Sequence, residues 1–228
     1  MADLSFLHDS GTVAAIDRHR EEAYQHRGRL GLSQAGHPCK RWLWYTHKGY
    51  AAAMPDGRVL RLFRLGDAIE RLVIGDLADA GCLVYHAQQE VEFIQDGVRL
   101  LGHIDGKVIG LKESPNTAHL FECKSANKKK FEELCKLADY ARWNEIYGFQ
   151  VQFYMLGLGL KRAAVFVYCK DDSRLYMERI RLDRDAAIEK LQAVFEAITS
   201  PIEPERRCPR ADYFQAKWCG HYQRCWGP

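Results

Sequence analysis

Two acidic side chains and one basic side chain fall in two short segments whose spacing suits chemistry on a phosphate ester. Phe121–Ser125 reads FECKS, and Gly102–Gly106 reads GHIDG. Both segments have the character of strands, in which side chains alternate between two faces, so Glu122 and Lys124 are expected to point the same way. If the two strands are neighbours, Asp105 joins this pair at one place.

Such a group suits a hard divalent cation. Mg²⁺ takes carboxylate oxygens and keeps several waters, and a cation held by Asp105 and Glu122 would polarise a phosphate and promote ionisation of a water. The backbone carbonyl of Cys123 is a further candidate ligand. Lys124 could orient or deprotonate the attacking water and stabilise the developing negative charge. Each residue alone is more simply a surface residue of an edge strand, and only their combination favours a site.

Two helices are expected to add side chains to this group. Glu70 lies beside the apolar face of a long amphipathic helix over residues 58–81, which could carry it inward as another metal ligand. Gln150 and Tyr154 are four residues apart on a later helix, hence on one face. An amide and a phenol aimed at one place can hydrogen-bond a substrate phosphate or base. Taken singly, all three are more often surface residues.

The elements that must position these residues follow a clear order along the chain. Alternating apolar residues and the turn signal Asp96-Gly97 predict a hairpin of strands, and the apolar spacing elsewhere predicts helices. Helices are expected over 10–24, 58–81, 128–136, 143–160 and 183–198, and strands over 82–94, 98–109, 118–125, 163–169 and 175–182. This order predicts an α/β or α+β fold, a sheet flanked by helices.

Length and composition set outer bounds. The chain has 228 residues, 47% of them apolar, which suits one domain with a sizeable core. The formal net charge of +3 neither demands nor excludes a polyanionic partner. The N-terminal segment lacks a basic start followed by an apolar run, and no apolar stretch is long enough to cross a bilayer. We therefore expect a soluble, cytoplasmic protein without a membrane partner.

Taken together, the motifs resemble those of the PD-(D/E)XK nuclease superfamily, in particular its RecB-like branch, with the CRISPR-associated RecB-like exonucleases and many phage exonucleases. The resemblance runs from about Gly31 to Trp226. Each motif is short, and their order makes the set specific. It rests on Gly66-x-x-x-Glu70, Gly102-His103-Ile104-Asp105-Gly106, Glu122-Cys123-Lys124 and Gln150-x-x-x-Tyr154.

The resemblance implies a role for each position. Asp105 and Glu122 resemble the metal-binding acids, Lys124 the catalytic lysine, and Glu70 the position held by histidine or glutamate in the family. Gln150 and Tyr154 resemble its substrate-positioning motif. The resemblance further implies Mg²⁺ or Mn²⁺, a restriction-endonuclease-like core, cleavage that leaves 5′-phosphates, and a bacterial or phage-encoded protein. DNA ends or single-stranded DNA are the implied substrate, and recombination, repair or CRISPR-adaptation proteins are candidate partners.

Four of the eight cysteines stand outside the segments expected to form the core. Cys39 comes early and Cys208, Cys219 and Cys225 come late. Four thiolates suit either an iron–sulfur cluster or a structural zinc. The resemblance implies a [4Fe-4S] cluster, and zinc is the alternative. Such a site would clamp residues 31–45 to residues 201–228, around a core over about 58–200 of a single nuclease domain.

The late cysteines depart from the pattern common in that branch. Cys219 and Cys225 keep a C-x₅-C spacing, but Cys208 lies further upstream than the family's C-x₂-C-x₅-C places it. His221 or His37 could replace a thiolate in a zinc site. Free core thiols are the remaining interpretation. The other four cysteines are expected to be small core residues: Cys82, Cys123, Cys135 and Cys169.

Several residues are candidates for holding the substrate. His103 shares the face of Asp105, and Lys128 begins a run of three lysines directly after the FECKS strand, although a charge run is usually a solvated face. Aromatic residues that could stack on unpaired bases, or equally belong to the core, are Trp42, Trp44, Tyr45, Trp143 and Tyr147.

Three other functions remain open. The chain could be a nucleic-acid-binding module on the same fold without catalysis. It could also be a metal-clamped subunit of a larger complex. The acids could instead act on RNA.

Overall fold

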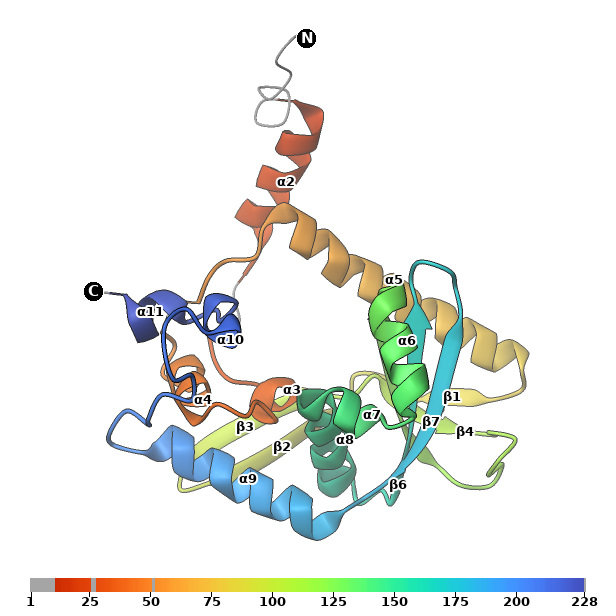
Figure 1. Ribbon diagram of the computed structural model, residues 1–228. Helices are drawn as coiled ribbons and strands as arrows, with labels where there is room; N and C mark the ends of the chain where they lie inside the picture. Colours follow the sequence, from red (N-terminus) through yellow and green to blue (C-terminus); the bar gives the residue numbers. More distant parts are fainter. Residues whose placement is uncertain (1–10, 26–27, 51, 228) are drawn as a thin grey trace.

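The computed structural model describes residues 11–25, 28–50 and 52–227, in which helices cover a five-stranded mixed sheet and a two-stranded sheet (Figure 1). The strands are β1 (Leu83–Tyr85), β2 (Glu90–Gln95), β3 (Val98–His103), β4 (Gly106–Ile109), β5 (His119–Ala126), β6 (Arg162–Cys169) and β7 (Leu175–Arg181). The helices are α2 (Thr12–Ala23), α3 (Leu32–Ala35), α4 (Lys40–His47), α5 (Gly57–Asp79), α6 (Lys128–Leu137), α7 (Tyr140–Trp143), α8 (Glu145–Leu158), α9 (Arg184–Thr199), α10 (Phe214–Lys217) and α11 (Tyr222–Trp226). The predicted fold class, a central mixed sheet flanked by helices, is confirmed.

The larger sheet has the strand order β1-β4-β5-β6-β7. β5 and β6 are parallel, and the other neighbours are antiparallel. A parallel pair needs a long crossover connection, which here runs through α6, α7 and α8. β5, the strand with the FECKS segment, therefore occupies the middle of the sheet.

The smaller sheet is the hairpin of β2 and β3. Asp96 and Gly97 form its turn with φ angles of 51° and 76°. Two consecutive positive φ angles are the mark of the type I′ turn that joins tightly twisted strands. The hairpin predicted from Asp96-Gly97 is confirmed.

The continuous strands predicted over 82–94 and 98–109 are wrong, because each is divided between the two sheets. β3 pairs with β2, whereas β4 pairs with β1 and β5. The chain bends at Asp105 between β3 and β4. An alternating apolar pattern continues through such a bend, since it records which residues face the core and not which sheet they join.

Different helices pack on the two faces of the larger sheet. α5 packs Ile69, Val73 and Leu77 on the face that contains Phe121 and Phe166. The long amphipathic helix expected over 58–81 is present, but its apolar residues are only partly buried, since Leu62, Leu65 and Leu72 are exposed. α8 covers the opposite face.

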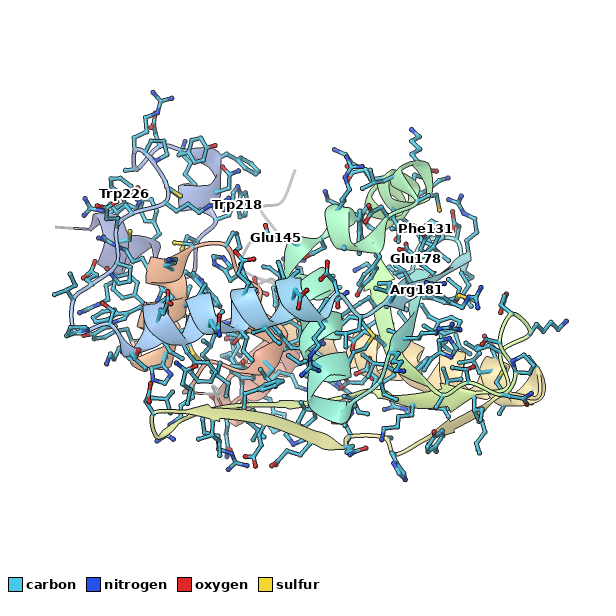
Figure 2. The ribbon with its side chains drawn as sticks, turned by 90° about the horizontal axis from the view of Figure 1, so that it is seen from below. Phe131, Glu145, Glu178, Arg181, Trp218 and Trp226 are labelled. Atoms are coloured by element: carbon cyan, nitrogen blue, oxygen red, sulfur yellow. The ribbon has the colours of Figure 1, made fainter. Side chains whose placement is uncertain are left out.

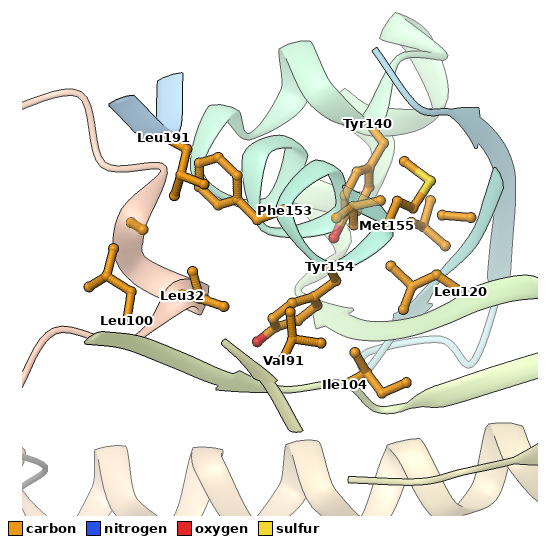
Figure 3. Close-up of a cluster of buried hydrophobic side chains, with 14 of the residues drawn as sticks. Leu32, Val91, Leu100, Ile104, Leu120, Tyr140, Phe153, Tyr154, Met155 and Leu191 are labelled. Atoms are coloured by element: carbon orange, nitrogen blue, oxygen red, sulfur yellow. The ribbon is translucent and has the colours of Figure 1, made fainter. Parts of the chain in front are cut away.

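α8 is buried along most of its length. Phe153, Tyr154 and Met155 are three consecutive buried residues that reach into the main core (Figure 3). The apolar face expected on the helix over 143–160 is therefore only part of the buried surface: Phe153 is buried, and Phe149, Leu156 and Leu160 are partly buried against the same core. A helix enclosed by two sheets and a neighbouring helix presents no single apolar face.

Direct hydrogen bonds join α4 to the segment after α9. Arg41 Nη1 lies 2.8 Å from Glu203 Oε1, and the Tyr45 hydroxyl donates to the same oxygen at 2.5 Å. Trp44 Nε1 donates to the carbonyl of Ser200 at 3.0 Å. The early and late segments thus lie side by side. No helix among the described residues is long and apolar enough to cross a membrane.

Candidate active site

The candidate site lies at the edge of β5, beside the point where β4 begins. Gly106 of β4 pairs with Phe121, whereas β5 continues alongside β6 as far as Ala126. One side of β5 therefore loses its neighbouring strand where the FECKS segment begins. Asp105 stands beside this open side, in the bend that precedes β4.

Asp105 takes the place of a strand partner for Cys123. Its Oδ2 accepts a hydrogen bond from the backbone N–H of Cys123 at 2.8 Å. The N–H and C=O of one strand residue point to the same side of the strand, so the Cys123 carbonyl is also directed toward the Asp105 side. A carboxylate and a backbone carbonyl, both hard oxygen donors, border the same space.

Glu122 is fully buried and engages only one of its two carboxylate oxygens. Oε1 accepts from Lys124 Nζ at 2.5 Å and from Gln150 Nε2 at 2.7 Å. Oε2 is buried too, and no described group forms a hydrogen bond with it. The predicted common face of Glu122 and Lys124 is therefore present. A buried oxygen without a partner costs free energy, and an oxygen-binding cation would remove that cost.

The carboxyl groups around β5 make one another harder to ionise. Burial raises the pKa of Glu122 to about 7, and the Asp105 carboxylate adds to the rise. Burial, Asp105 and Asp67 raise the pKa of Glu70 to about 7 as well. Burial also raises the pKa of Asp105. Crowded carboxylates of this kind fit a divalent cation, whose charge inverts the local preference for the neutral form.

α5 brings Glu70 to the site because its neighbours pack on the sheet. Ile69 and Val73 are buried against β5 and β6, which leaves Glu70 half-buried at their border. Asp67 was not predicted, although it lies one turn before Glu70 on the same side of the helix. Two acids at this spacing were the signal available in the sequence, but acidic pairs on exposed helices are common.

Lys124 remains a cation in this environment. Burial alone would lower the pKa of Lys124, but the Glu122 and Asp105 carboxylates raise it well above its ordinary value. The ammonium also lies 5.2 Å from the centroid of the Tyr147 ring. Lys124 is therefore a hydrogen-bond donor here, and the alternative that it deprotonates a water is disfavoured.

Tyr140 is a buried neighbour of this group that the sequence did not identify. Its side chain is fully buried, and its hydroxyl has no hydrogen-bond partner among the described residues. Burial and the nearby Glu122 raise the pKa of Tyr140 well above its ordinary value, against the opposing effect of Lys124. Tyr140 begins the four-residue helix α7, whose position depends on tertiary packing and has no signature in the sequence.

Tyr154 is buried in the core and supports the site through its packing, but it does not line the site. Its ring lies in the core, directed from α8 toward the two-stranded sheet (Figure 3). A Cβ on Gly102 would come within 2.7 Å of this ring and its hydroxyl, so only glycine leaves room for the tyrosine. Gln150 and Tyr154 lie on one face of α8, as predicted. Tyr154 packs against Gly102 of the GHIDG segment, and Gln150 donates to the Glu122 carboxylate.

Two predicted positioning residues, His103 and Lys128, form their hydrogen bonds and ion pairs with described residues outside this group. His103 lies at the exposed end of β3, and its Nε2 is 3.9 Å from Glu90 Oε2. Lys128 begins α6, where its backbone N–H donates to Asp171 at 2.7 Å and its side chain is exposed. Their roles stay predictions.

A cleft with a volume of about 910 Å³ opens onto the site. Lys124, Gln150 and Tyr147 lie in its wall, together with the predicted stacking residue Trp42. Other aromatic side chains continue that wall: Tyr24, Tyr50, Phe63 and Trp218. The predicted stacking residues Trp44 and Tyr45 are buried instead.

The four cysteines outside the core lie near one another. The hydroxyl of Thr46 on α4 lies 2.9 Å from His221 Nε2, and Arg41 Nη1 lies 3.9 Å from Cys225 Sγ, so the segment after Cys39 contacts the segment that contains Cys219 and Cys225. Burial raises the pKa of the Cys219 thiol, and Cys39, Cys225 and Cys208 add to the rise. Among the other four, Cys123 and Cys169 are buried as predicted, whereas Cys135 is exposed. Within the described residues, no three His, Cys, Asp or Glu side chains are grouped tightly enough to hold a metal ion as they stand.

Comparison with known proteins yields likenesses of fold. No protein-family profile and no curated protein matches the sequence. SSO0001 is similar with a TM-score of 0.55 and 14% identity, over 96% of this chain and 98% of that chain. An alkaline exonuclease, LHK-Exo from Laribacter hongkongensis, is similar with a TM-score of 0.53 and 18% identity, over 79% and 90%. Its complex with dAMP gives 0.50 and 18%, over 81% and 90%. The central mixed sheet with flanking helices is thus an arrangement that this chain shares with that alkaline exonuclease.

Proposed function

We propose that this protein is a metal-dependent deoxyribonuclease of the PD-(D/E)XK superfamily, of the RecB-like branch, that trims DNA ends. The environment of Glu122 carries the proposal. One oxygen of this buried carboxylate is fixed by Lys124 and Gln150, and the other has no hydrogen-bond partner among the described residues. The likeness of the fold to an alkaline exonuclease supports the same conclusion.

The donors fit Mg²⁺ or Mn²⁺. Asp105, Glu122 and Glu70 supply carboxylate oxygens, and the Cys123 carbonyl supplies a neutral one, which is the donor chemistry that these cations prefer. A bound cation would polarise the phosphodiester and promote ionisation of the attacking water. Binding would draw the carboxylates closer together than they lie in the free protein.

The protein's own groups complete the reaction. Lys124 holds a positive charge beside Glu122 and can donate to the phosphate oxygens as negative charge develops on them. Gln150 fixes the Glu122 carboxylate through its 2.7 Å hydrogen bond. The half-buried Glu70 borders the same space from α5. No side chain needs to form a covalent bond with the substrate.

Cleavage of end-labelled single- and double-stranded DNA tests this function. With Mn²⁺ the wild-type protein is expected to release products with 5′-phosphates, and EDTA to stop the reaction. Lys124→Ala should reduce the rate by at least a hundredfold with little change in far-UV circular dichroism. Lys112→Ala, which removes an exposed lysine from the β4–β5 loop, is the matched control. Equal rates for Lys124→Ala and wild type would refute the proposal, and DNA binding without any cleavage would favour the binding-module alternative.

We also propose that Cys39, Cys208, Cys219 and Cys225 hold a [4Fe-4S] cluster. The proposal rests on the contacts that bring the segment after Cys39 beside the C-terminal segment, and on four thiols that are neither in the core nor paired as disulfides. Arg41, whose Nη1 lies 3.9 Å from Cys225 Sγ, would balance part of the charge of such a cluster. Elemental analysis of freshly purified protein separates the alternatives. Iron with visible absorbance supports the cluster, and one equivalent of zinc without colour would contradict it.

A further inference from the structure

The cleft beside the candidate site exposes two large aromatic rings that the core does not explain. Trp218 is 79% exposed and Phe63 is 54% exposed, and both line this cleft. Trp218 lies on the side of the C-terminal segment that faces the rest of the protein (Figure 2). Large apolar rings gathered at a concave surface are typical of a binding site.

Phe63 has a defined position relative to the candidate site. It lies seven residues before Glu70 on α5, and this spacing puts both side chains on nearly the same side of the helix. At 1.5 Å per residue the two positions are about 10 Å apart along the helix axis. Stacked nucleotides repeat about every 3.4 Å along one strand. A strand cut beside Glu70 would therefore reach Phe63 roughly three nucleotides away.

Trp218 comes to the same cleft from a distant part of the sequence. It follows α10, next to Cys219 in the segment proposed to hold the cluster. Lys124, Gln150 and Tyr147 lie in the wall of this cleft. One continuous space therefore contains the proposed catalytic lysine and both exposed rings.

The charges next to the cleft favour a nucleic-acid occupant over a protein. A neighbouring pocket of about 490 Å³ shares Arg29 with the cleft and adds His47, Lys48 and Arg99. Burial lowers the pKa of His47, and Lys48 and Arg29 lower it further, as expected where positive charge collects. Phosphates of an extended strand would meet Arg29 and Lys48 while its bases meet the rings. Arg99 is already paired with Glu90 and Glu92, and the lowered pKa of His47 keeps its imidazole neutral.

We infer that Phe63 and Trp218 form a stacking site for unpaired nucleobases of a single strand that extends from the scissile bond. The inference rests on the proposed nuclease function for the direction of the strand. Stacking of one base on an aromatic side chain contributes about 1–3 kcal/mol and tolerates any base. The site therefore determines how firmly a single-stranded end is held, without selecting its sequence.

Binding of a fluorescein-labelled single-stranded oligonucleotide to the full-length protein in EDTA tests the inference, because no cleavage occurs there. A second oligonucleotide of equal length has abasic sites in place of all internal bases. Trp218→Ala is expected to weaken binding of the first about tenfold and to leave binding of the abasic one nearly unchanged. Phe63→Ala should act in the same direction, and Trp218→Tyr should restore most of the affinity.

Phe214→Ala is the matched control. Phe214 is 72% exposed and lies next to Trp218, but it does not line the cleft. The Phe214→Ala variant should bind both oligonucleotides with the affinity of the wild type. Equal affinity of Trp218→Ala and wild type for the base-containing strand would overturn the stacking site, and this is the result expected if a protein partner or a second copy occupies the cleft. An equal loss on both oligonucleotides would also overturn it.

The binding assay separates the stacking site from the proposed function. If Trp218→Ala reduces only base-dependent binding but the wild type never cleaves DNA, the stacking site stands and the nuclease proposal fails. If the wild type cleaves DNA but the two oligonucleotides bind alike in every variant, the nuclease proposal stands and the stacking site fails.

Discussion

The two carboxylate oxygens of Glu122 have different surroundings. The difference explains how one oxygen can be held in place while the other is available to bind a cation. Oε1 is fixed by an ammonium and an amide, whereas Oε2 has no hydrogen-bond partner among the described residues. Burial keeps water from solvating either oxygen. In the absence of a cation, ionisation of Glu122 and Glu70 is therefore costly.

This cost leads to a prediction of how the stability of the folded protein depends on pH and on bound metal. The pKa of Glu70 is about 7 in the folded protein against 4.5 in an unfolded chain, so the folded state binds the proton more tightly. The metal-free protein should lose stability as pH rises from about 4.5 to 7, and its melting temperature should fall by several degrees. Mn²⁺ should raise the melting temperature more at about pH 8 than at about pH 5.

Glu70→Gln is the matched variant for this test. It removes one ionisable carboxyl from the group while keeping its shape. In EDTA, scanning calorimetry should find it more stable than the wild type at about pH 8 and equal to it near pH 4, where Glu70 is neutral in both states. A melting temperature that rises with pH in the metal-free wild type would contradict the assigned pKa shifts.

At the scale of elements, the site depends on how closely β3 approaches α8. Gly102 allows this approach, because any Cβ there would collide with the Tyr154 ring and with Leu32. The contact also holds Gln150, one turn before Tyr154, against Glu122. The glycine in GHIDG is therefore a packing requirement, and it acts on catalysis through the position of α8.

Gly102→Ala is expected to destabilise the protein by about 1–3 kcal/mol through overpacking and to slow cleavage in the fraction that remains folded. Gly75→Ala on α5 is the control, because no atom lies within 4 Å of the added methyl. That change should stabilise the helix by about 0.5–1 kcal/mol. Urea denaturation of both variants measures the difference, and equal stabilities would remove the steric argument.

The elements also show which features of the fold and the site could be predicted from the sequence alone. Alternation along β5 was enough to place Glu122 and Lys124 on one face, and Asp96-Gly97 fixed the hairpin. The bend at Asp105 escaped prediction because the apolar pattern runs through it unchanged. Asp67 and Tyr140 escaped because the approach of Asp67 to Asp105 and of Tyr140 to Lys124 depends on how α5 and α7 pack. Local sequence patterns carry no information about such packing.

At the scale of the whole molecule, the segments before α5 and after α9 are joined without any metal. Arg41 and Tyr45 both contact Glu203, and Trp44 contacts Ser200. These hydrogen bonds and the ion pair hold the two segments together directly. A cluster would strengthen an existing contact and keep Trp218 beside the cleft.

Cys39→Ser should therefore remove the iron while leaving the core folded. We expect loss of visible absorbance and a fall of several degrees in the melting temperature, since metal binding contributes to folding. Cys135→Ser, which changes an exposed thiol on α6, should alter neither property. Full iron content in Cys39→Ser would exclude that residue as a ligand.

The most direct test of the central claim is the position of Mn²⁺ in crystals, located by its anomalous scattering. We predict one strong peak within ligating distance of Glu122 Oε2 and Asp105, next to the Cys123 carbonyl. A Mn²⁺ ion bound only elsewhere, with Glu122 Oε2 left without a ligand at saturating metal, would contradict a cation-dependent site at the edge of β5.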